Sequence, residues 1–357
     1  MSSMIGNKIK LSVFGESHGE AIGCVIDGLP HGIKLDFDEI NREMARRAPG
    51  NDKTATPRKE SDTPIILSGV LNDTTTGAPL AMEIRNTNTR SGDYGNLMTV
   101  PRPSHSDYPA YVKYNGNNDV RGGGHFSGRL TAPIVFAGAV AKQILKAKGI
   151  VIGAHISQID NACDDNFDKN NISAEELEAV THKKFAVIND ESEAEMRASV
   201  ELARMNGDSI GGIIECAAIG IPVGLGGNIF DTVECRLSAA LFGVPAVKGV
   251  QFGAGFDFAE MRGSQANDGY EIKDGKVALL SNNNGGVLGG MTSGAPIVFS
   301  VVLKPTPSIS VPQKSVNLQT MENETLVVKG RHDPCVVPRA VPVIEGITAI
   351  TLLDLMM

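Results

Sequence analysis

Strand-like and helix-like patterns alternate along this chain without a linker-like segment, which constrains the fold more than any other feature. Apolar and polar residues alternate at 9–13, which predicts a strand, and a second strand is expected at 21–26. Helical spacing follows at 36–47, where Asp36 is placed to cap the first turn. Interleaving of this kind favours one α/β or α+β domain.

The centre of the chain combines a strong helix pattern with two unusual segments. Residues 132–147 have a strongly apolar helix pattern. The stretch 87–128 is rich in Gly, Asn, Ser, Pro and Asp, and so long a structureless stretch is usually functional. Residues 160–195 are acidic and polar, and we expect them to form a solvent-exposed segment on the surface. Other expected elements are strands at 64–70, 80–84, 150–156, 210–218 and 296–303, and helices at 231–241 and from Val341 onward.

Two segments of the chain resemble each other. Ile22 and Gly23 lead through a strand to a Gly-Leu-Pro turn and a helix, and Ile210 and Gly211 lead through a strand to Gly-Ile-Pro and a helix. Two related halves and chance similarity explain this pattern about equally well. The expected organisation is a single domain over residues 1–357, with two related halves as an open alternative.

Charge and composition exclude several classes of protein. A net charge of −8 and a pI near 5.5 argue against a bulk nucleic-acid binder. The 5 cysteines are scattered and lack a CxxC pair, so neither a disulfide framework nor a metal site is predicted. No apolar run reaches the roughly 18 residues of a membrane span. The N-terminus lacks the apolar core of a secretory signal, so a cytoplasmic protein is expected.

Basic residues and loop histidines point to an anion site. Arginine suits bidentate recognition of phosphate and carboxylate, and histidine carries protons near neutral pH. Each residue alone is more typical of a solvated or hydrogen-bonded surface position than of a binding site. Together they favour a site that handles protons and phosphate. The basic cluster is Arg42, Arg46, Arg47, Lys53, Arg58 and Lys59, and the histidine loops are 17–18, 104–107 and 331–333.

Two motif matches point to other functions. Residues 15–19 match the G-x-S-x-G elbow of α/β-hydrolases, but that fold builds several strands before its serine, and Ser17 comes too early. Residues 164–175 have the acidic spacing of a calcium loop, but Lys169 stands where the turn requires glycine. A capping box formed by Ser173 and Glu176 explains that segment more simply.

Segments in order over nearly the whole chain resemble the chorismate synthase family. Several are long and are not explained by generic turn chemistry, so the chain is identified as a member of that family. The segments are FGESHG (14–19), RRAPG (46–50), ILSGV (66–70), TTGAPL (75–80), RPSHSDY (102–108), RGGG (121–124), NNGGVLGGMTSG (283–294), KPTPSI (304–309) and GRHDPCVVPRAVPVIE (330–345).

The resemblance implies a fold, a reaction and a cofactor. The fold is α+β, a single-domain β-α-β sandwich in which antiparallel sheets enclose helices, assembled as a homotetramer. The reaction is an anti-1,4-elimination of phosphate from 5-enolpyruvylshikimate 3-phosphate to give chorismate, the last common step of the shikimate pathway to aromatic amino acids. Reduced FMN is required without net redox change. An external flavin reductase is the expected source, with NADPH as an indirect electron donor.

The resemblance also implies roles for individual residues. His18 acts on the phosphate side, His105 faces the flavin and favours its protonated reduced state, and Asp333 lies near flavin N5. Ser17 and Ser127 are proton relays. Substrate or NADPH contacts are Arg46, Arg47, Lys53, Arg129 and Arg339, and FMN contacts are His125, Phe126, Ser127, Pro245, Ala246, Gly289, Lys304, Pro305, Thr306, Pro307, Ser308 and Arg331.

One segment departs from the family pattern. The common RGGGRSSARE reads RGGGHFSGRL at 121–130, so that His125, Phe126 and Leu130 replace Arg, Ser and Glu. The flavin phosphate is then expected to be held differently. Two alternatives stay open: a bifunctional form that reduces its own flavin with NADPH, and a non-catalytic relative that binds flavin or a phosphosugar.

Overall fold

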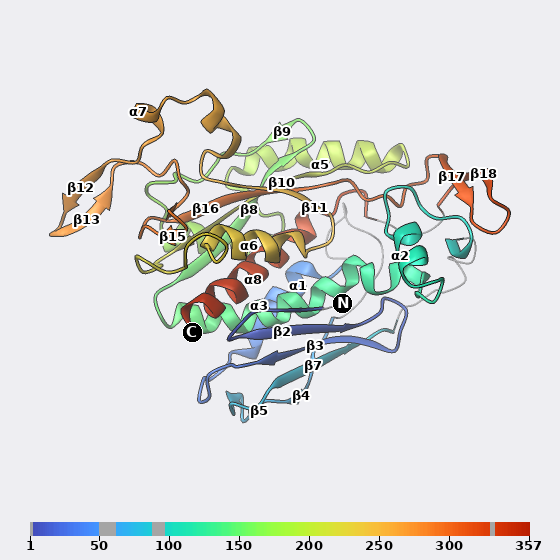
Figure 1. Ribbon diagram of the computed structural model, residues 1–357, viewed down its shortest axis with the longest axis horizontal. Coiled ribbons are helices and arrows are strands. Elements are labelled where there is room, and N and C mark those ends of the chain that lie inside the picture. The colour runs from blue at the N-terminus through green and yellow to red at the C-terminus, as the bar shows by residue number, and fades with distance from the viewer. Residues whose placement is uncertain (1–2, 50–61, 88–96, 329–332) are drawn as a thin grey trace.

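Two antiparallel sheets enclose a layer of helices in this protein (Figure 1). The structure, a computed structural model, describes residues 3–49, 62–87, 97–328 and 333–357. The first sheet has the strand order β1-β2-β3-β7-β4, and the second has the order β11-β16-β10-β8-β9. The predicted α+β sandwich with helices between antiparallel sheets is therefore confirmed.

The first sheet turns one apolar face toward the helices. Alternation along its strands buries side chains such as Leu11, Ile22 and Met82 and leaves their neighbours on the outer face. Leu11 lies opposite Ile26 in the pairing of the second and third strands. The strands are β1 (Met4–Ile5), β2 (Lys10–Gly15), β3 (Ala21–Asp27), β4 (Ile65–Ser68) and β7 (Leu80–Arg85).

The second sheet is covered on both faces, by the helical layer inside and by further helices outside. Most side chains of its central strands are accordingly apolar, as is typical of a doubly covered sheet, and the buried His155 and Glu215 are paired with each other over 3.0 Å. The strands are β8 (Val151–Ile159), β9 (Ala162–Cys163), β10 (Gly212–Ile219), β11 (Val247–Phe252) and β16 (Ile297–Leu303), and the outer helices are α4 (Ala174–His182) and α5 (Asp190–Met205).

The expectation of a solvent-exposed segment at 160–195 is wrong. Leu177 on α4 is fully buried, as is Met196 on α5 just beyond this segment, because each helix packs a narrow apolar stripe against the sheet. Val187, in the connection between the two helices, is fully buried too. The acidic residues lie on the opposite, solvent-facing side of each helix and dominate the composition of the segment. The predicted capping box of Ser173 and Glu176 is confirmed at the start of α4.

The helical layer consists of α1 (Phe37–Arg47), α3 (Thr131–Lys146), α6 (Val233–Phe242) and α8 (Val337–Met356). The helices α3 and α8 pack closely at a glycine pair: a Cβ on Gly138 would lie 2.1 Å from the Cα of Gly346. Asp36 caps α1 as predicted. The last helix begins earlier than Val341, because Pro338 in its first turn needs no hydrogen-bond partner.

The remaining elements are short and lie in the connections. Among the described residues, none of the helices is long and apolar enough to cross a membrane. The strands are β5 (Val70–Leu71), β6 (Thr74–Thr75), β12 (Tyr270–Lys273), β13 (Lys276–Leu279), β14 (Val287–Leu288), β15 (Met291–Thr292), β17 (Gln313–Asn317) and β18 (Glu322–Leu326), and the helical segments are α2 (Asp107–Lys113), η2 (Arg121–Phe126), η3 (Gly128–Leu130), η4 (Gly255–Glu260) and α7 (Gly263–Ala266).

The two similar segments of the sequence occupy matching places. The strands β3 and β10 are each central in a five-stranded sheet, and each leads through a proline turn to a helix of the central layer. The division of the chain into one domain with two related halves stays a prediction.

Candidate active site

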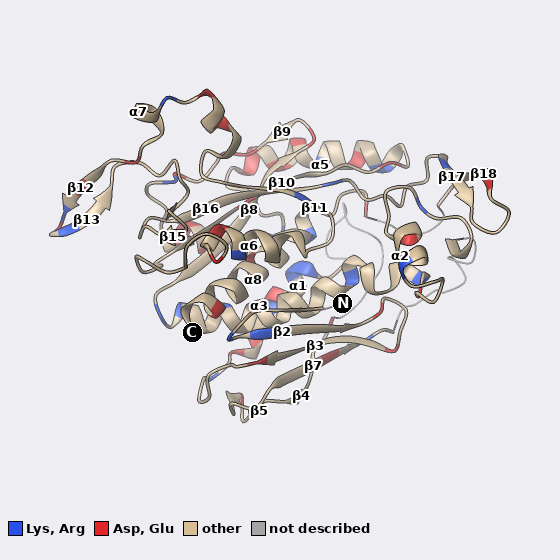
Figure 2. Ribbon diagram, in the orientation of Figure 1, with Lys and Arg blue, Asp and Glu red and all other residues tan. Residues whose placement is uncertain are grey.

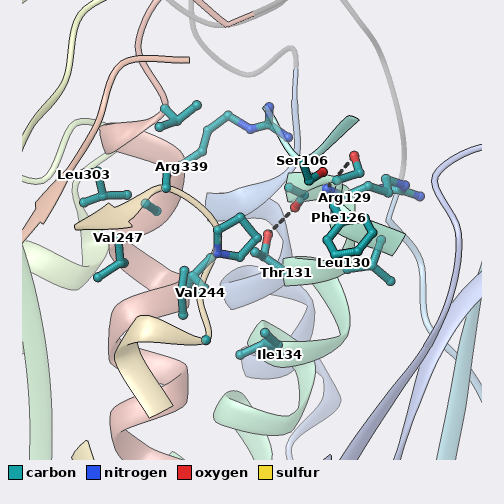
Figure 3. A pocket seen from close by; sticks show the side chains of 18 of the residues that line it. Ser106, Phe126, Arg129, Leu130, Thr131, Ile134, Val244, Val247, Leu303 and Arg339 are labelled. Atoms are coloured by element: carbon teal, nitrogen blue, oxygen red, sulfur yellow. Dashed lines mark hydrogen bonds between the residues drawn. The ribbon is translucent and has the colours of Figure 1, made fainter. Parts of the chain in front are cut away.

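A cavity of about 950 Å³ opens at one end of the helical layer, between the two sheets. Its volume is at the upper end of the usual range for small-molecule sites, roughly 300–1,000 Å³. In Figure 3, Val244, Val247 and Leu303 form one apolar side, and Arg339 reaches from α8 toward the side of Arg129 and Thr131.

Predicted site residues from distant parts of the chain meet at this cavity. The long polar stretch 97–128 and the start of α3 form one wall, and the loops that follow α6 and β16 form another. The lining includes these predicted residues: Arg47, His105, His125, Phe126, Ser127, Arg129, Pro245, Ala246, Lys304, Thr306, Pro307, Ser308, Asp333 and Arg339.

Some predicted residues lie elsewhere. Within the described part of the chain, Ser17, His18, Arg46, Gly289 and Pro305 are outside the cavity lining. Lys53 and Arg331 lie outside the described residues. The predicted roles of all these residues as contacts of substrate, FMN or NADPH remain predictions.

Ser17 and His18 lie directly behind the glycine turn of η2. A Cβ on Gly122 would lie 2.7 Å from Ser17 Oγ and 2.6 Å from His18 Cδ2. Gly122 and Gly123 both have positive φ, and the backbone N–H of Ser17 donates to the carbonyl of Gly124 over 3.1 Å. The glycine run is therefore needed for the close approach of these two loops.

Arg46 faces the interior instead of the cavity. Its guanidinium donates to Glu345 Oε2 over 2.6 Å, to Glu345 Oε1 over 2.8 Å and to Glu43 Oε2 over 2.7 Å. Lys142 Nζ also contacts both carboxylates. Burial alone would lower the pKa of Arg46, but Glu345 and Glu43 raise it above its usual value. This geometry gives Arg46 an ion-pair role between α1, α3 and α8 and no direct route to a ligand in the cavity.

Arg47, the next residue, does line the cavity. Its Nη1 donates to Asp62 Oδ2 over 2.9 Å, its Nε donates to Thr131 Oγ1 over 3.1 Å and its Nη2 donates to the carbonyl of Gly128 over 2.9 Å. Arg129 donates from the other side to Asp62 Oδ1. Burial alone would raise the pKa of Asp62, but the two arginines lower it, so the carboxylate is ionised between them. Figure 2 shows basic and acidic segments together along α1, between the sheets.

A second ionic contact borders the cavity at the start of α8. Arg339 Nη1 donates to Asp333 Oδ2, and Arg339 Nε donates to the carbonyl of Arg47 over 3.0 Å. Across the cavity, Lys304 donates to the carbonyl of Ser104 over 2.5 Å. Burial and the neighbouring Lys248 lower the pKa of Lys304. Basic side chains therefore cluster at this cavity although the protein as a whole is acidic, which suits a polyanionic small molecule.

His125, which departs from the family pattern, is tied to the N-terminal strands. Its Nδ1 lies 2.8 Å from the carbonyl of Gly15, and its Nε2 lies 2.7 Å from Ser3 Oγ. Both ring nitrogens thus have protein partners. His125 cannot form the bidentate hydrogen bonds of a guanidinium group, which the arginine common in the family at this position offers.

Sequence reasoning missed several residues that organise the cavity. Asp62 joins two cavity arginines, but nothing in its local sequence distinguishes it from a surface aspartate. Asn86 receives a bond from Arg129 Nε over 3.2 Å and donates to the carbonyls of Glu16 and Gly19, which ties the first loop to the arginines. Arg102 and Asp107 were inside a recognised motif, and their spacing around His105 was the available signal.

The fold and cavity define a class of protein: an α+β enzyme with a buried, cation-rich site for an anionic small molecule. The sequence profile described as chorismate synthase matches residues 9–357. The chain is 47% identical over 352 residues to a chorismate synthase of Thermococcus kodakarensis, with 98% of this chain and 96% of that one covered. It is 43% identical over 364 residues to one from Dehalococcoides mccartyi, with 99% and 96% covered.

A solved structure gives the same result. The fold matches one described as a crystal structure of chorismate synthase, with a TM-score of 0.76, 30% identity and coverage of 98% of this chain and 92% of the other. The chain belongs to the chorismate synthase family. It is thereby a carbon–oxygen lyase of the shikimate pathway, in aromatic amino-acid biosynthesis.

Proposed function

We propose that this cavity eliminates phosphate from 5-enolpyruvylshikimate 3-phosphate with the help of reduced FMN. The observation that carries the proposal is the convergence of His105, Ser127, Asp333 and the cavity arginines on one chamber, from segments far apart in the chain. In the reaction, a C–O bond to phosphate and a C–H bond break and a double bond forms. One proton and one phosphate leave, and no electrons are gained or lost overall.

The residues present fit both a flavin and the substrate. The apolar side formed by Val244, Val247 and Leu303 suits a flat ring system, and the opposite side carries the charges. The volume of about 950 Å³ has room for two ligands. Thr306 and Ser308, with Lys304 beside them, are placed to hold the FMN phosphate and ribityl groups. When bound, reduced FMN supplies electron density to the reacting system without being consumed.

The chain itself handles the charge and the proton. Arg47, Arg129 and Arg339 bind the phosphate and carboxylates of the substrate, because guanidinium groups match these anions with paired hydrogen bonds. His18, behind the glycine turn, serves the leaving phosphate, and Ser17 and Ser127 relay protons. His105 and Asp333 serve ring nitrogens of the flavin. Substrate and flavin bound in the cavity would displace water from it, which strengthens each of these electrostatic contacts.

An anaerobic assay with chemically reduced FMN and 5-enolpyruvylshikimate 3-phosphate tests the proposal. We expect phosphate and chorismate in equal amounts, and neither product with oxidised FMN. A matched His105→Ala variant is expected to bind substrate while losing turnover. Flavin binding without either product would mean that the motifs persist in a non-catalytic or altered-substrate relative.

The same assay separates the two sources of reduced flavin. We propose that an external flavin reductase supplies the reduced FMN. With oxidised FMN and NADPH under nitrogen, the protein alone is then expected to make no chorismate, and an added flavin reductase is expected to restore it. Turnover with the protein alone would establish the bifunctional alternative.

We also propose a cytoplasmic homotetramer, as in the family resemblance. Apolar side chains exposed at the sheet edge and on a projecting hairpin support self-association, among them Leu67, Ile272 and Val277. All 5 cysteines are free thiols, which suits a reducing compartment. Light scattering coupled to gel filtration is expected to give about four times the mass of one chain, 37.7 kDa. A monomer at micromolar concentration would contradict this assembly.

A further inference from the structure

A carboxylate lies directly behind the imidazole of His105 in the cavity wall. His105 Nδ1 is 2.5 Å from Asp107 Oδ1, whereas Ser106 Oγ and Arg102 Nη2 lie 3.4 Å and 3.1 Å from the same nitrogen. The side chain of Asp107 is 4% exposed and that of His105 is 15% exposed. The shortest contact of Nδ1 is thus with an oxygen that water reaches poorly.

Arg102 holds this carboxylate in one orientation. Its Nε donates to Asp107 Oδ2 over 2.7 Å, its Nη2 donates to Oδ1 over 2.8 Å and its backbone N–H donates to Oδ2 over 3.0 Å. Its Nη1 donates to Ser308 Oγ over 3.1 Å, which anchors the guanidinium in the loop after β16. Burial alone would raise the pKa of Asp107, but the bonds from Arg102 and His105 lower it well below its usual range. The carboxylate is therefore ionised and accepts hydrogen bonds only.

These contacts determine which nitrogen of His105 carries the proton. A bare Nδ1 lone pair at 2.5 Å from an ionised oxygen would be repelled, whereas an Nδ1–H group makes a short charge-assisted hydrogen bond. Burial, with Arg102 and Lys304 nearby, lowers the pKa of His105 below its ordinary value despite Asp107, so the ring is neutral near pH 7. A neutral ring with a proton on Nδ1 has its lone pair on Nε2.

The other ring nitrogen lies against the glycine turn at the cavity. A Cβ on Gly123 would be 3.3 Å from Nε2 and 3.6 Å from the Cβ of Ser127. We infer that Asp107, held by Arg102, is a positioning residue that fixes the Nδ1–H tautomer of His105 and so presents Nε2 to the cavity as a hydrogen-bond acceptor. An acceptor there favours the protonated form of a ring nitrogen placed against it. This use in turnover rests on the proposed function, whereas the tautomer is a property of the protein alone.

The Asp107→Asn variant is expected to reverse the tautomer. The Oδ2 position accepts two bonds from Arg102, so the amide oxygen takes that position and its NH2 group faces His105. Nδ1 must then accept, and the proton moves to Nε2. We expect kcat to fall roughly 100-fold, the lower end of what a positioned acid–base group contributes, with the substrate KM changed less than about twofold. A mainly structural role would instead change the unfolding midpoint and leave the tautomer alone.

Solid-state ¹⁵N spectra of histidine-labelled protein at pH 7, without substrate or flavin, test the inference directly. The His105 signals are assigned by their loss in His105→Gln. In the unsubstituted protein we expect a protonated Nδ1 and a bare Nε2, and in Asp107→Asn the reverse. The matched control is Asp119→Asn, because Asp119 accepts the same three bonds from Arg121 and is not among the described partners of His105 Nδ1, which are Arg102, Ser106 and Asp107.

The outcomes separate this inference from the proposed function. An Nε2–H tautomer or a doubly protonated ring in the unsubstituted protein would overturn the inference, even if Asp107→Asn did not fold. An unchanged His105 tautomer in a folded Asp107→Asn variant would overturn it too. The expected spectra together with a negative turnover assay would leave the inference standing and the proposed function refuted.

Discussion

Arg46 and Arg47 are adjacent on α1, yet they belong to two different ionic clusters. Arg46 lies among Glu43, Lys142 and Glu345 in the middle of the helical layer, where Glu345 is 0% exposed. Arg47 lies against Asp62 at the cavity, where Arg129 shares the same carboxylate. Consecutive helix residues point about 100° apart, so one side chain meets α8 and the other meets the ligand chamber.

The two clusters differ in their balance of charge. In the interior cluster, Glu43 and Glu345 face Arg46 and Lys142, and Arg42 at the edge brings a third carboxylate, Glu39, so that cations and carboxylates are equal in number. In the cavity cluster, a single carboxylate serves two guanidinium groups, which leaves a positive surplus. A balanced buried cluster holds helices together, whereas a cluster with surplus charge attracts an anion.

The largest expected effect is on stability, from Glu345→Ala. Its removal leaves Arg46 and Lys142 with Glu43 as their one remaining carboxylate partner in this cluster and takes away the carboxylate that accepts from the backbone N–H of Ala154. We expect the free energy of unfolding to fall by about 3–5 kcal/mol. Urea unfolding followed by circular dichroism, at one protein concentration, measures it. A decrease in the free energy of unfolding below about 1 kcal/mol would contradict a stabilising role for the interior cluster.

The next effect is on activity, from Arg47→Gln. Arg129 still pairs with Asp62 in this variant, so the carboxylate keeps a partner. We expect kcat/KM for the proposed substrate to fall about 100-fold, or about 2.7 kcal/mol, and stability to fall less than in Glu345→Ala. The control is Arg204→Gln on α5, whose guanidinium pairs with Glu201 at the surface. Equal loss of activity in both variants would contradict a cavity role for Arg47.

A smaller effect is expected on the way the free energy of unfolding depends on pH. Burial alone would raise the pKa of Glu43, but Lys142, Arg46 and Arg42 lower it to about 2 from 4.5. A lowered carboxylate pKa adds stability above pH 4.5 that is lost as the pH falls from 4.5 toward 2. Unfolding measured between about pH 5 and pH 3.5 is therefore expected to depend less steeply on pH in Glu43→Gln, by about 1–2 kcal/mol across that range. Parallel curves for the two proteins would show that Glu43 is not titrating as the structure implies.

The smallest effect is expected for an ion pair at the surface. Its contribution to the free energy of unfolding is a reference for the two buried clusters. Lys146 and Glu178 lie 2.7 Å apart, with side chains 58% and 44% exposed. We expect Glu178→Gln to change the free energy of unfolding by less than about 0.5 kcal/mol, because water screens the pair. The same urea experiment measures it. A change comparable to that of Glu345→Ala would mean that burial is not what separates these ion pairs.

Much of the architecture could be predicted from local pattern. The alternation around Leu11 predicted β2, and the apolar run at 132–147 predicted α3 within one residue at each end. Residues 160–195 were misjudged, since an apolar stripe as narrow as that of Leu177 and Val180 is hidden by acidic composition. Whether such a stripe is buried depends on a sheet formed elsewhere in the chain.

The site could be predicted in part. The motifs that carry His105, Ser127 and Asp333 brought the right loops together, because long motifs constrain backbone conformation as well as chemistry. The same motifs predicted Arg46 and Arg47 as equivalent contacts of the substrate or NADPH. The distinction between them required the position of α8.

By itself, the amino-acid sequence determined the family and most helices and strands. Only the tertiary structure decided which charges are paired in the core and which face the cavity, and which tautomer Asp107 imposes on His105. The physical reason is that ionic and hydrogen-bonding energies depend on distance and burial. Those quantities arise when residues far apart in the chain, such as Arg46 and Glu345, are packed together.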